Sequence, residues 1–322
     1  MVALDCIEGS NKTINFSNFF MKISLKLFTA AALLLIISSC TNSSKQAVTD
    51  TPSEGTIHIS VEQSFKPFID EQLKVFASSY PKANIIVHYK SEIECMKDLV
   101  EDSTRMVLVT RGLDKKEQEG FKTQLSFNPT FGILAYNAVA VIVHQQAKDT
   151  VFTMKDLQDR LIGKKQGTVV MDGTNLTGIV RFLKDSLAKN NTLGKNVMAA
   201  AGSQAVIEYV AAHPEAIGFV GMNWIGDTYD QKQAEYRKKV KTGLVECTLC
   251  IEKGYFSHPS PSTISQGQYS LSLPIYFILK ENSPGLGSGF LNFMSLERGQ
   301  LIFRRSFLVP AKMSFKERKG LL

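Results

Sequence analysis

The chain contains 322 residues, of which 44% are hydrophobic, and its formal net charge is +7. The hydrophobic content indicates a well-packed globular body. Basic residues are spread along the sequence except for the run Arg237–Lys241, which is typical of a solvated helix end. No aromatic stacking pattern accompanies this run, so the positive charge does not indicate a nucleic-acid partner.

The segment Met21–Cys40 has the order of a secretory signal peptide. Lys22 and Lys26 form a short basic start, an apolar run follows as far as Ile37, and two serines lead to Cys40. A single transmembrane anchor is the alternative, but the apolar run is shorter than the roughly 20 residues that a span needs. The ending Ile-Ser-Ser-Cys resembles the lipobox of bacterial lipoproteins. This resemblance implies that Cys40 is acylated, becomes the first mature residue and tethers the protein outside the cytoplasm, without ATP or NAD(P)H as cofactor.

Two further N-terminal segments are excluded from the folded body. Residues 1–20 show no basic-to-apolar order, which indicates a mis-assigned start with Met21 as the true initiator. Residues 41–54 are polar and predict a flexible tether. Removing residues 1–40 leaves 322 − 40 = 282 residues, a length that suggests two lobes.

Strands and helices alternate through the rest of the chain. Residues 56–61 predict a strand, Ser64 is expected to cap a helix that reaches Phe76, and residues 84–89 predict a second strand. Strand–helix–strand order favours parallel pairing with a right-handed crossover. The remaining expected strands are 106–110, 138–143, 168–171, 216–221 and 275–280, and helices are expected at 91–102, 113–121, from 153, 179–189, from 203 and 286–303. Ser91 and Glu94 have the spacing of a capping box, Thr153 is expected to open its helix, and Ser203 is expected to cap the helix that follows it. The order predicts an α/β fold.

Three places share a strand, a short polar turn and a helix start: residues 61–65, 89–93 and 171–179. A helix start offers unpaired N–H donors and a partial positive charge, so it favours anions. In an open parallel sheet such turns gather at the carboxyl ends of the strands, where ligands bind. Ordinary capping explains any one of these turns, and only the set predicts an oxyanion site.

Five motifs in chain order resemble the periplasmic phosphate-binding proteins of ABC importers. They are Gly55–Ser60 with Ser64 and Pro67, Val109–Leu113 with Glu117, Ala216–Gly221, Tyr269–Phe277, and Phe290–Phe293 with the residues up to Pro310. The resemblance implies two mostly parallel α/β lobes joined by a hinge, residues 55–135 with 270–322 and residues 136–269. It also implies a monomer that captures phosphate or a similar oxyanion by lobe closure and hands it to an ABC permease in the inner membrane, with no catalysis.

Site residues follow from the resemblance position by position. The first turn is matched by Ser64 and the Phe65 amide, and the second by Ser91. The family's Ser-Arg pair is matched by Thr110 and Arg111, where the arginine either contacts ligand or braces the cleft wall by a salt bridge. The second-lobe turn is matched by residues 177–179, so Thr177, Gly178, the nearby Asn175 and Arg181 complete the expected ligand-binding set.

Several positions depart from the family pattern. Arg105 stands where the family carries an aspartate that accepts the proton of phosphate, and Asp172 is the possible substitute. Glu92 and its neighbours replace the glycines of the second turn. Gly173 stands where an arginine is expected, a charge for which Lys164, Lys165 and Arg181 are candidates.

Alternatives to transport stay open. The departures motivate a ligand-less sensory or scaffolding lipoprotein of the same fold that docks a membrane partner. A secreted hydrolase ranks below both, because no nucleophile–base arrangement, Gly-x-Ser-x-Gly elbow or P-loop is present. No histidine pair has metal-ligand spacing, so no metal is expected. Cys247 and Cys250 form a CxxC that suits either a structural disulfide or a redox pair, and the apolar residues around it (Leu244, Val245, Leu249 and Ile251) predict a strand.

Overall fold

The structure is a computed structural model that describes residues 50–101, 103–173, 177–189 and 191–312. The proposed start, the signal peptide, Cys40 and Asn175 lie outside these ranges. None of the helices within them combines the length and apolar character that a membrane span requires.

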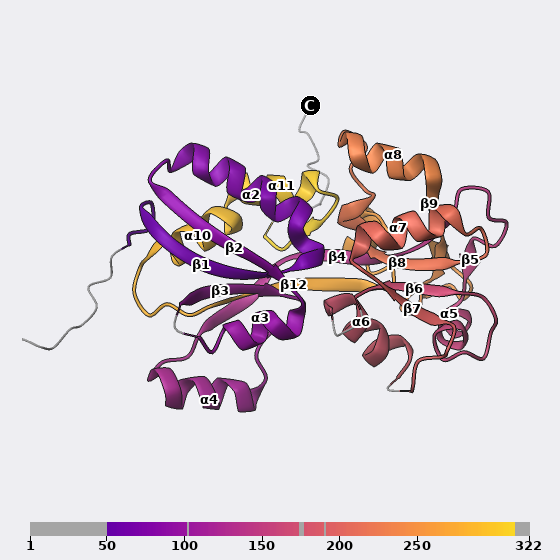
Figure 1. Cartoon of the computed structure of the whole chain (residues 1–322), viewed down its shortest axis with the longest axis horizontal. Coiled ribbons are helices and arrows are strands. Elements are labelled where there is room, and N and C mark those ends of the chain that lie inside the picture. The colour runs from indigo at the N-terminus through magenta and orange to yellow at the C-terminus, as the bar shows by residue number, and fades with distance from the viewer. Residues whose placement is uncertain (1–49, 102, 174–176, 190, 313–322) are drawn as a thin grey trace, which may run out of the picture. The chain divides into compact units, whose positions relative to one another are not determined.

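A mixed sheet runs through the described body in the order β2-β1-β3-β12-β4-β8-β6-β7, with β13 and β9 also paired to β4 (Figure 1). Its strands are β1 (Gly55–Glu62), β2 (Ala83–Lys90), β3 (Thr104–Val109), β4 (Thr130–His144), β6 (Val169–Asp172), β7 (Val197–Ala200), β8 (Ile217–Gly221), β9 (Val240–Thr242), β12 (Ser272–Leu279) and β13 (Val309–Pro310). A second, three-stranded sheet contains β5 (Val151–Phe152), β10 (Leu244–Glu246) and β11 (Phe256–Ser257).

Helices cover both faces of the large sheet. In Figure 1, α2, α10 and α11 lie on one side of β1 and β3, and α3 and α4 lie on the other. The helices are α2 (Lys66–Ser79), α3 (Glu92–Asp98), α4 (Lys115–Leu125), α5 (Met154–Leu161), α6 (Gly178–Phe182), α7 (Ser203–Ala212), α8 (Gln231–Lys239), α9 (Pro261–Ser265), α10 (Leu286–Ser295) and α11 (Glu297–Arg305); 3₁₀ turns occur at Gln63–Phe65 and Met222–Trp224, and a π-helical turn at Leu183–Leu187.

The predicted strand–helix–strand unit is confirmed, because β1 and β2 pair in parallel along their whole length. Parallel pairs also join β1 to β3, and β6 to both β7 and β8. The two long central strands break this pattern, since β12 is antiparallel to both β3 and β4, and β4 is antiparallel to β8. The fold is therefore α/β with parallel strands at both ends of a mixed sheet.

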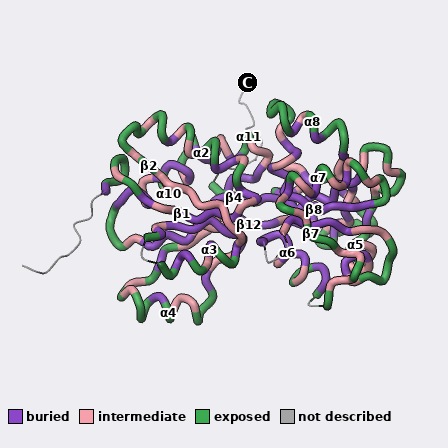
Figure 2. Tube along the Cα trace, viewed as in Figure 1, coloured by how far each residue is buried: buried purple, intermediate pink, exposed green. Residues whose placement is uncertain are grey.

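Buried side chains separate into clusters that change over along β4 and β12. Ala135 and Ile275 belong to a core with β1, α2 and α10, whereas Ala138 and Leu273 belong to a core with β6, β8 and α7. Figure 2 shows the buried strands running through the middle of both regions. A third cluster, around Leu99, lies under α3 and α4. We propose that the two lobes divide at this changeover, close to the boundaries expected at residues 135 and 270.

The expected tether is wrong at its C-terminal end. Asp50 is 4% exposed, accepts a hydrogen bond from the Leu286 amide at 2.6 Å and pairs with Arg105 at 3.0 Å. A Cβ on Gly289 would lie 1.9 Å from the carbonyl oxygen of Pro52. The segment that starts at Asp50 therefore packs against the beginning of α10 as part of the folded body.

The two cysteines of the CxxC form a disulfide, with a Cα–Cα distance of 5.6 Å between Cys247 and Cys250. Of the flanking residues expected in a strand, Leu244 and Val245 lie in β10, which ends at Glu246, whereas Leu249 and Ile251 are exposed outside it. Cys95 is a buried free thiol, and its burial raises its pKa above the usual value.

Candidate functional site

Hydroxyl groups from both lobes meet at the carboxyl ends of the parallel strands. Ser64 follows β1, Thr110 follows β3, and Thr177 follows β6. A Cβ placed on Gly178 would lie 2.3 Å from the Thr110 side chain, so the first residue of α6 touches the end of β3. Figure 1 shows α3 and α6 facing each other beside the central strands. Of the residues expected from the sequence, the structure brings together Ser64, Thr110, Thr177, Gly178 and Arg181.

The first turn already holds a carboxylate. Glu62, the last residue of β1, is fully buried, and its Oε2 accepts the Ser64 amide at 3.1 Å and the Ser64 hydroxyl. The expected Ser64 cap is therefore wrong: its hydroxyl donates to Glu62, and α2 begins at Lys66 with Phe65 as its N-cap residue. The Phe65 ring is buried against Phe68.

A second carboxylate occupies the turn after β3. Glu92 is 2% exposed, and its Oε2 accepts the Thr110 amide at 2.7 Å and the Thr110 hydroxyl. Its other oxygen accepts Nε of Arg181 at 2.5 Å, while Nη2 of Arg181 donates to Thr110 Oγ1 at 2.7 Å. Thr110 and Arg181 thus form one donor group around a carboxylate.

The third turn is organised by Asp172, the last residue of β6. Its carboxylate oxygens accept the hydroxyls of Thr177 and Ser203, each at 3.0 Å, and it is fully buried. Thr177 caps α6 by accepting the Val180 amide at 3.3 Å. Ser203 was expected to be an N-cap, but Gly202 takes that position and the Ser203 hydroxyl serves Asp172.

Burial controls the ionisation of these carboxyl groups. Loss of solvation raises the pKa of Asp172 to about 7. Burial, reinforced by the charge of Asp172, raises the pKa of Glu62 well above its usual value. Glu62 Oε1 also has no hydrogen-bond partner within the described part of the chain. Glu62 therefore combines a raised pKa, which favours its protonated form, with one uncommitted oxygen.

Two expected site residues are engaged elsewhere. Ser91 caps α3 in a reciprocal capping box with Glu94, as the Ser-x-x-Glu spacing predicts. Arg111 binds both oxygens of Glu117 at 2.7 and 2.8 Å, so in this structure it has the bracing role that was its alternative.

The structure shows where the residues that depart from the family pattern lie. Arg105 lies at the amino end of β3, where it pairs with Asp50 and Glu281. Because the site is at the carboxyl end of that strand, Arg105 does not replace a ligand-contacting carboxylate. Of the basic residues considered for the missing charge, Lys165 pairs with Asp156, and Arg181 reaches the site.

Sequence reasoning missed the contribution of Glu62 to the site and of two residues after β8. Asn223 Nδ2 and Trp224 Nε1 both donate to the Ser64 carbonyl oxygen at 2.8 Å, which joins the second lobe to the first turn. An acidic residue at the end of an apolar strand was the available signal for Glu62. No local signal marked the other two.

A cavity of about 560 Å³ lies beside the turns. Its lining includes Gln63, Lys90, Ser91, Gly173 and Thr177, which come from all three strand–turn–helix units. Among the described residues no group of histidine, cysteine, aspartate and glutamate side chains is arranged to hold a metal ion.

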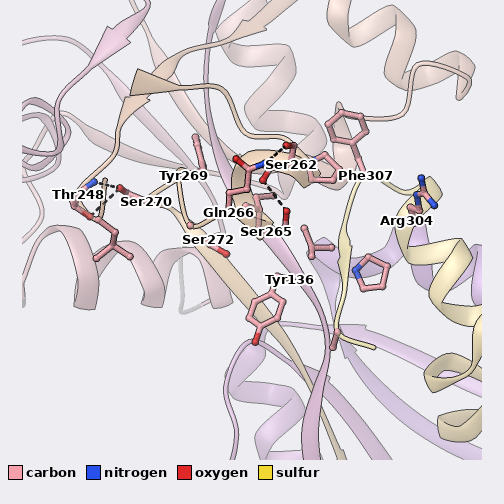
Figure 3. A pocket seen from close by; sticks show the side chains of 17 residues that line it. Tyr136, Thr248, Ser262, Ser265, Gln266, Tyr269, Ser270, Ser272, Arg304 and Phe307 are labelled. Carbon is pink, nitrogen blue, oxygen red and sulfur yellow. Dashed lines mark hydrogen bonds between the residues drawn. The ribbon is translucent and has the colours of Figure 1, made fainter. Parts of the chain in front are cut away.

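A larger cavity, of about 1130 Å³, lies away from these turns (Figure 3). Tyr136, Gln266, Tyr269, Arg304 and Phe307 are among the residues that line it. None of the ligand-binding residues expected from the sequence that the structure describes takes part, so we do not assign the ligand to this cavity.

The fold and the cleft of convergent donors define a two-lobed binding protein of the periplasmic-binding-protein type. The PBP superfamily domain matches residues 46–297, and the chain belongs to this superfamily. The chain is 24% identical over 270 residues to the phosphate-binding protein PstS of Pseudomonas aeruginosa, covering 75% of this chain and 79% of that protein. Its relatives are binding proteins, and the chain is accordingly a binding protein and not an enzyme.

Solved structures show the same fold. A putative phosphate ABC transporter substrate-binding protein from Clostridium perfringens, with bound phosphate, has a TM-score of 0.64 at 19% identity and covers 80% of this chain and 100% of its own. An ABC-type phosphate transport receptor from Vibrio cholerae has a TM-score of 0.60 at 16% identity, with coverage of 80% and 100%.

Replacing Gly178 with valine is expected to hold the lobes apart. Its side chain would enter the space of Thr110, and lobe movement is the easiest relief of that overlap. Small-angle X-ray scattering should show a larger radius of gyration than for the wild-type protein. Gly120→Val is the matched control, because a Cβ at Gly120 meets nothing within 4 Å. An equal radius for the two variants would contradict the expectation.

Proposed function

We propose that this protein is a lipid-anchored extracytoplasmic solute-binding protein that captures phosphate or a similar oxyanion between its lobes and delivers it to an ABC permease. Cys40 would carry the lipid, and the mature protein would act as a monomer. Ser64, Thr110, Thr177, Gly178 and Arg181 are the proposed core of the ligand site. The Phe65 amide, Ser91 and Arg111 stay in the proposed set as groups that would reach the ligand after rearrangement. Asn175 stays in the set on the strength of the sequence alone.

One observation carries this proposal. The amide and hydroxyl of Ser64 converge on a single carboxylate oxygen, and those of Thr110 converge on another, with Arg181 beside the second. Backbone N–H groups, hydroxyls and a guanidinium that share an anionic oxygen are the donors that an oxyanion needs. The phosphate-binding relatives support the same ligand class.

Asp172 supports phosphate over sulfate. A buried carboxylate near neutrality can accept a hydrogen bond from a proton-bearing phosphate oxygen, which sulfate lacks. Burial raises the pKa of Glu62 and so favours its protonated form, which can donate through the uncommitted oxygen to an ionised phosphate oxygen. This assigns to Asp172 and Glu62 the discrimination that Arg105 does not provide.

Calorimetric titration of the mature chain with phosphate, sulfate, molybdate and tungstate tests the ligand. We expect heat and a thermal shift with phosphate, a weaker response with sulfate, and loss of the phosphate response in Ser64→Ala. Ser265→Ala is the control, because that exposed hydroxyl lies on α9. The absence of both heat and thermal shift with every anion would refute the oxyanion proposal.

The second candidate function is a ligand-less sensory or scaffolding lipoprotein. The specific observation in its favour is that Glu62 and Glu92 already satisfy the donors of two turns. Failure of both the wild-type protein and Glu62→Gln/Glu92→Gln to bind any of the four anions, with both proteins folded, would favour this candidate over capture.

The lipid anchor has its own test. Cys40→Ser should move the protein from the detergent phase to the aqueous phase in a Triton X-114 partition of cells that express it. Cys6→Ser should leave the partition unchanged, since residues 1–20 are proposed to lie upstream of the true start. Detergent partition of Cys40→Ser would contradict acylation at this cysteine.

A further inference from the structure

One ionic contact spans the cleft at the ligand site. Arg181 belongs to α6 in the second lobe, and it donates to Glu92 on α3 at 2.5 Å and to Thr110 after β3 at 2.7 Å. The Glu92 side chain is 2% exposed and that of Arg181 29% exposed. The pair is therefore shielded from solvent on the Glu92 side, where charge interactions are screened least.

Glu92 makes the contacts that a bound oxyanion would make. One of its oxygens accepts the Thr110 amide and hydroxyl from the first lobe, and the other accepts the Arg181 guanidinium from the second. A ligand that closes a two-lobed protein works in the same way, by binding donors on both lobes at once. A carboxylate fixed to α3 has this effect without any solute.

The contact at the first turn is of a different kind. Asn223 and Trp224 from the second lobe donate to the Ser64 carbonyl oxygen, and no ionised group takes part. This part of the closed arrangement can persist or open independently of solute charge. The charged link between the lobes around Thr110 thus depends on the Glu92–Arg181 pair.

We propose that Glu92 is an internal counter-ligand that closes the cleft in the absence of solute, and that an incoming oxyanion must displace its carboxylate from Thr110 and Arg181. The displacement of Glu92 by an oxyanion rests on the proposed function. Closure of the cleft by Glu92 without solute does not depend on that function. Displacement would leave Thr110 and Arg181 to the solute, while Glu92 turns toward the cavity that borders α3.

The charge of Glu92 is expected to weaken the binding of an oxyanion. Because wild-type Glu92 both competes for the donors and repels an anion at close range, Glu92→Gln is expected to lower the Kd for phosphate at least about tenfold. A glutamine keeps the size of the side chain but loses the charged contact with Arg181. The same substitution should therefore weaken closure of the empty protein.

The fluorescence of Trp224 can be used to measure closure of the cleft. It is the one tryptophan of the sequence, and its Nε1 donates to Ser64 across the lobes at 2.8 Å. Opening would hydrate the indole and shift its emission to longer wavelength. Emission spectra and radii of gyration should be measured for the mature chain with Cys40→Ser, to keep it in solution, without anion and then with inorganic phosphate.

We expect the Glu92→Gln protein without phosphate to show a red-shifted emission and a larger radius, and phosphate to reverse both. Glu94→Gln is the matched control, because it removes one carboxylate from the same helix without touching Arg181. Arg181→Lys keeps the charge but loses the second donor group, so the cleft of this variant should open partly. This variant tests the proposal if the Glu92→Gln protein does not fold.

The outcomes separate the two proposals. Opening of Glu92→Gln, or of Arg181→Lys where Glu92→Gln does not fold, would support the counter-ligand in closure. If the wild-type and Glu92→Gln proteins also respond to none of phosphate, sulfate, molybdate and tungstate, the oxyanion function is overturned. The wild-type, Glu92→Gln and Glu94→Gln proteins could instead bind phosphate with equal affinity and show the same emission and radius. That result would support the oxyanion function and overturn the proposal that Glu92 is a counter-ligand. If both the Glu92→Gln and the Arg181→Lys protein have the emission and radius of the wild-type protein, the counter-ligand proposal is likewise overturned.

Discussion

Replacing Arg181 with methionine is expected to lower the free energy of unfolding by about 3–5 kcal/mol, since it leaves a buried carboxylate without its cationic partner. Glu92 is 2% exposed, and within the described part of the chain the donors left to it would be the Thr110 amide and hydroxyl. Urea unfolding of the wild-type and variant proteins at neutral pH, followed by circular dichroism, measures the difference.

The double variant Arg181→Met/Glu92→Gln should recover most of this loss, because no unpaired charge is then buried. Lys66→Met provides the comparison with an exposed pair. Lys66 and Asp70 are about half exposed, at 52% and 45%, and such pairs contribute less than about 1 kcal/mol. A loss in Arg181→Met no larger than that in Lys66→Met would show that the cleft pair is as weak as a surface pair.

The stability of the folded body is expected to fall as the pH rises from about 4 to 7. Burial raises the pKa of Asp172 to about 7 in the folded protein, whereas an unfolded aspartate has a pKa near 3.9. Between these values the folded state holds the proton that the unfolded state has lost. The contribution is fully present below the unfolded pKa and disappears as the pH passes through the folded pKa, at up to roughly 1.4 kcal/mol for each pH unit.

Carboxylates with a lowered pKa act in the opposite direction at lower pH. Hydrogen bonds lower the pKa of Glu94 and Glu117, through Ser91 and Arg111 respectively, so their stabilisation is lost on acidification below about pH 4. Urea midpoints measured at intervals from pH 3 to 8 should therefore pass through a maximum in the acidic range. Asp172→Asn should flatten the decline above that maximum. An unchanged slope in this variant would assign the decline to other groups.

Local sequence signals predicted the elements well where caps and periodicity decide them. The Ser91 capping box, the Thr153 cap of α5 and the parallel β1–β2 pair are all confirmed. The five ordered motifs also indicated the superfamily that the comparisons show. The caps depend on residues within one turn of each other, and the parallel pair follows from the strand–helix–strand order, so spacing and order along the sequence are sufficient to find them.

The candidate site was predicted only in part. Thr110, Thr177, Gly178 and Arg181 were expected together and do meet, but Ser91 and Arg111 are occupied by neighbours in the sequence. The same hydrogen-bonding capacity serves a local cap or a remote ligand, and spacing does not distinguish them.

The amino-acid sequence by itself determined the export signal pattern, the alternation of strands and helices, and the presence of hydroxyls at helix starts. Tertiary structure decided that β4 and β12 run antiparallel through the sheet and that Asp50 packs against α10. It also decided that three acidic residues, at positions 62, 92 and 172, enter the same cleft. Their proximity follows from the meeting of strand ends in a folded sheet, and the burial that raises the pKa values of Glu62 and Asp172 exists only once the chain has folded.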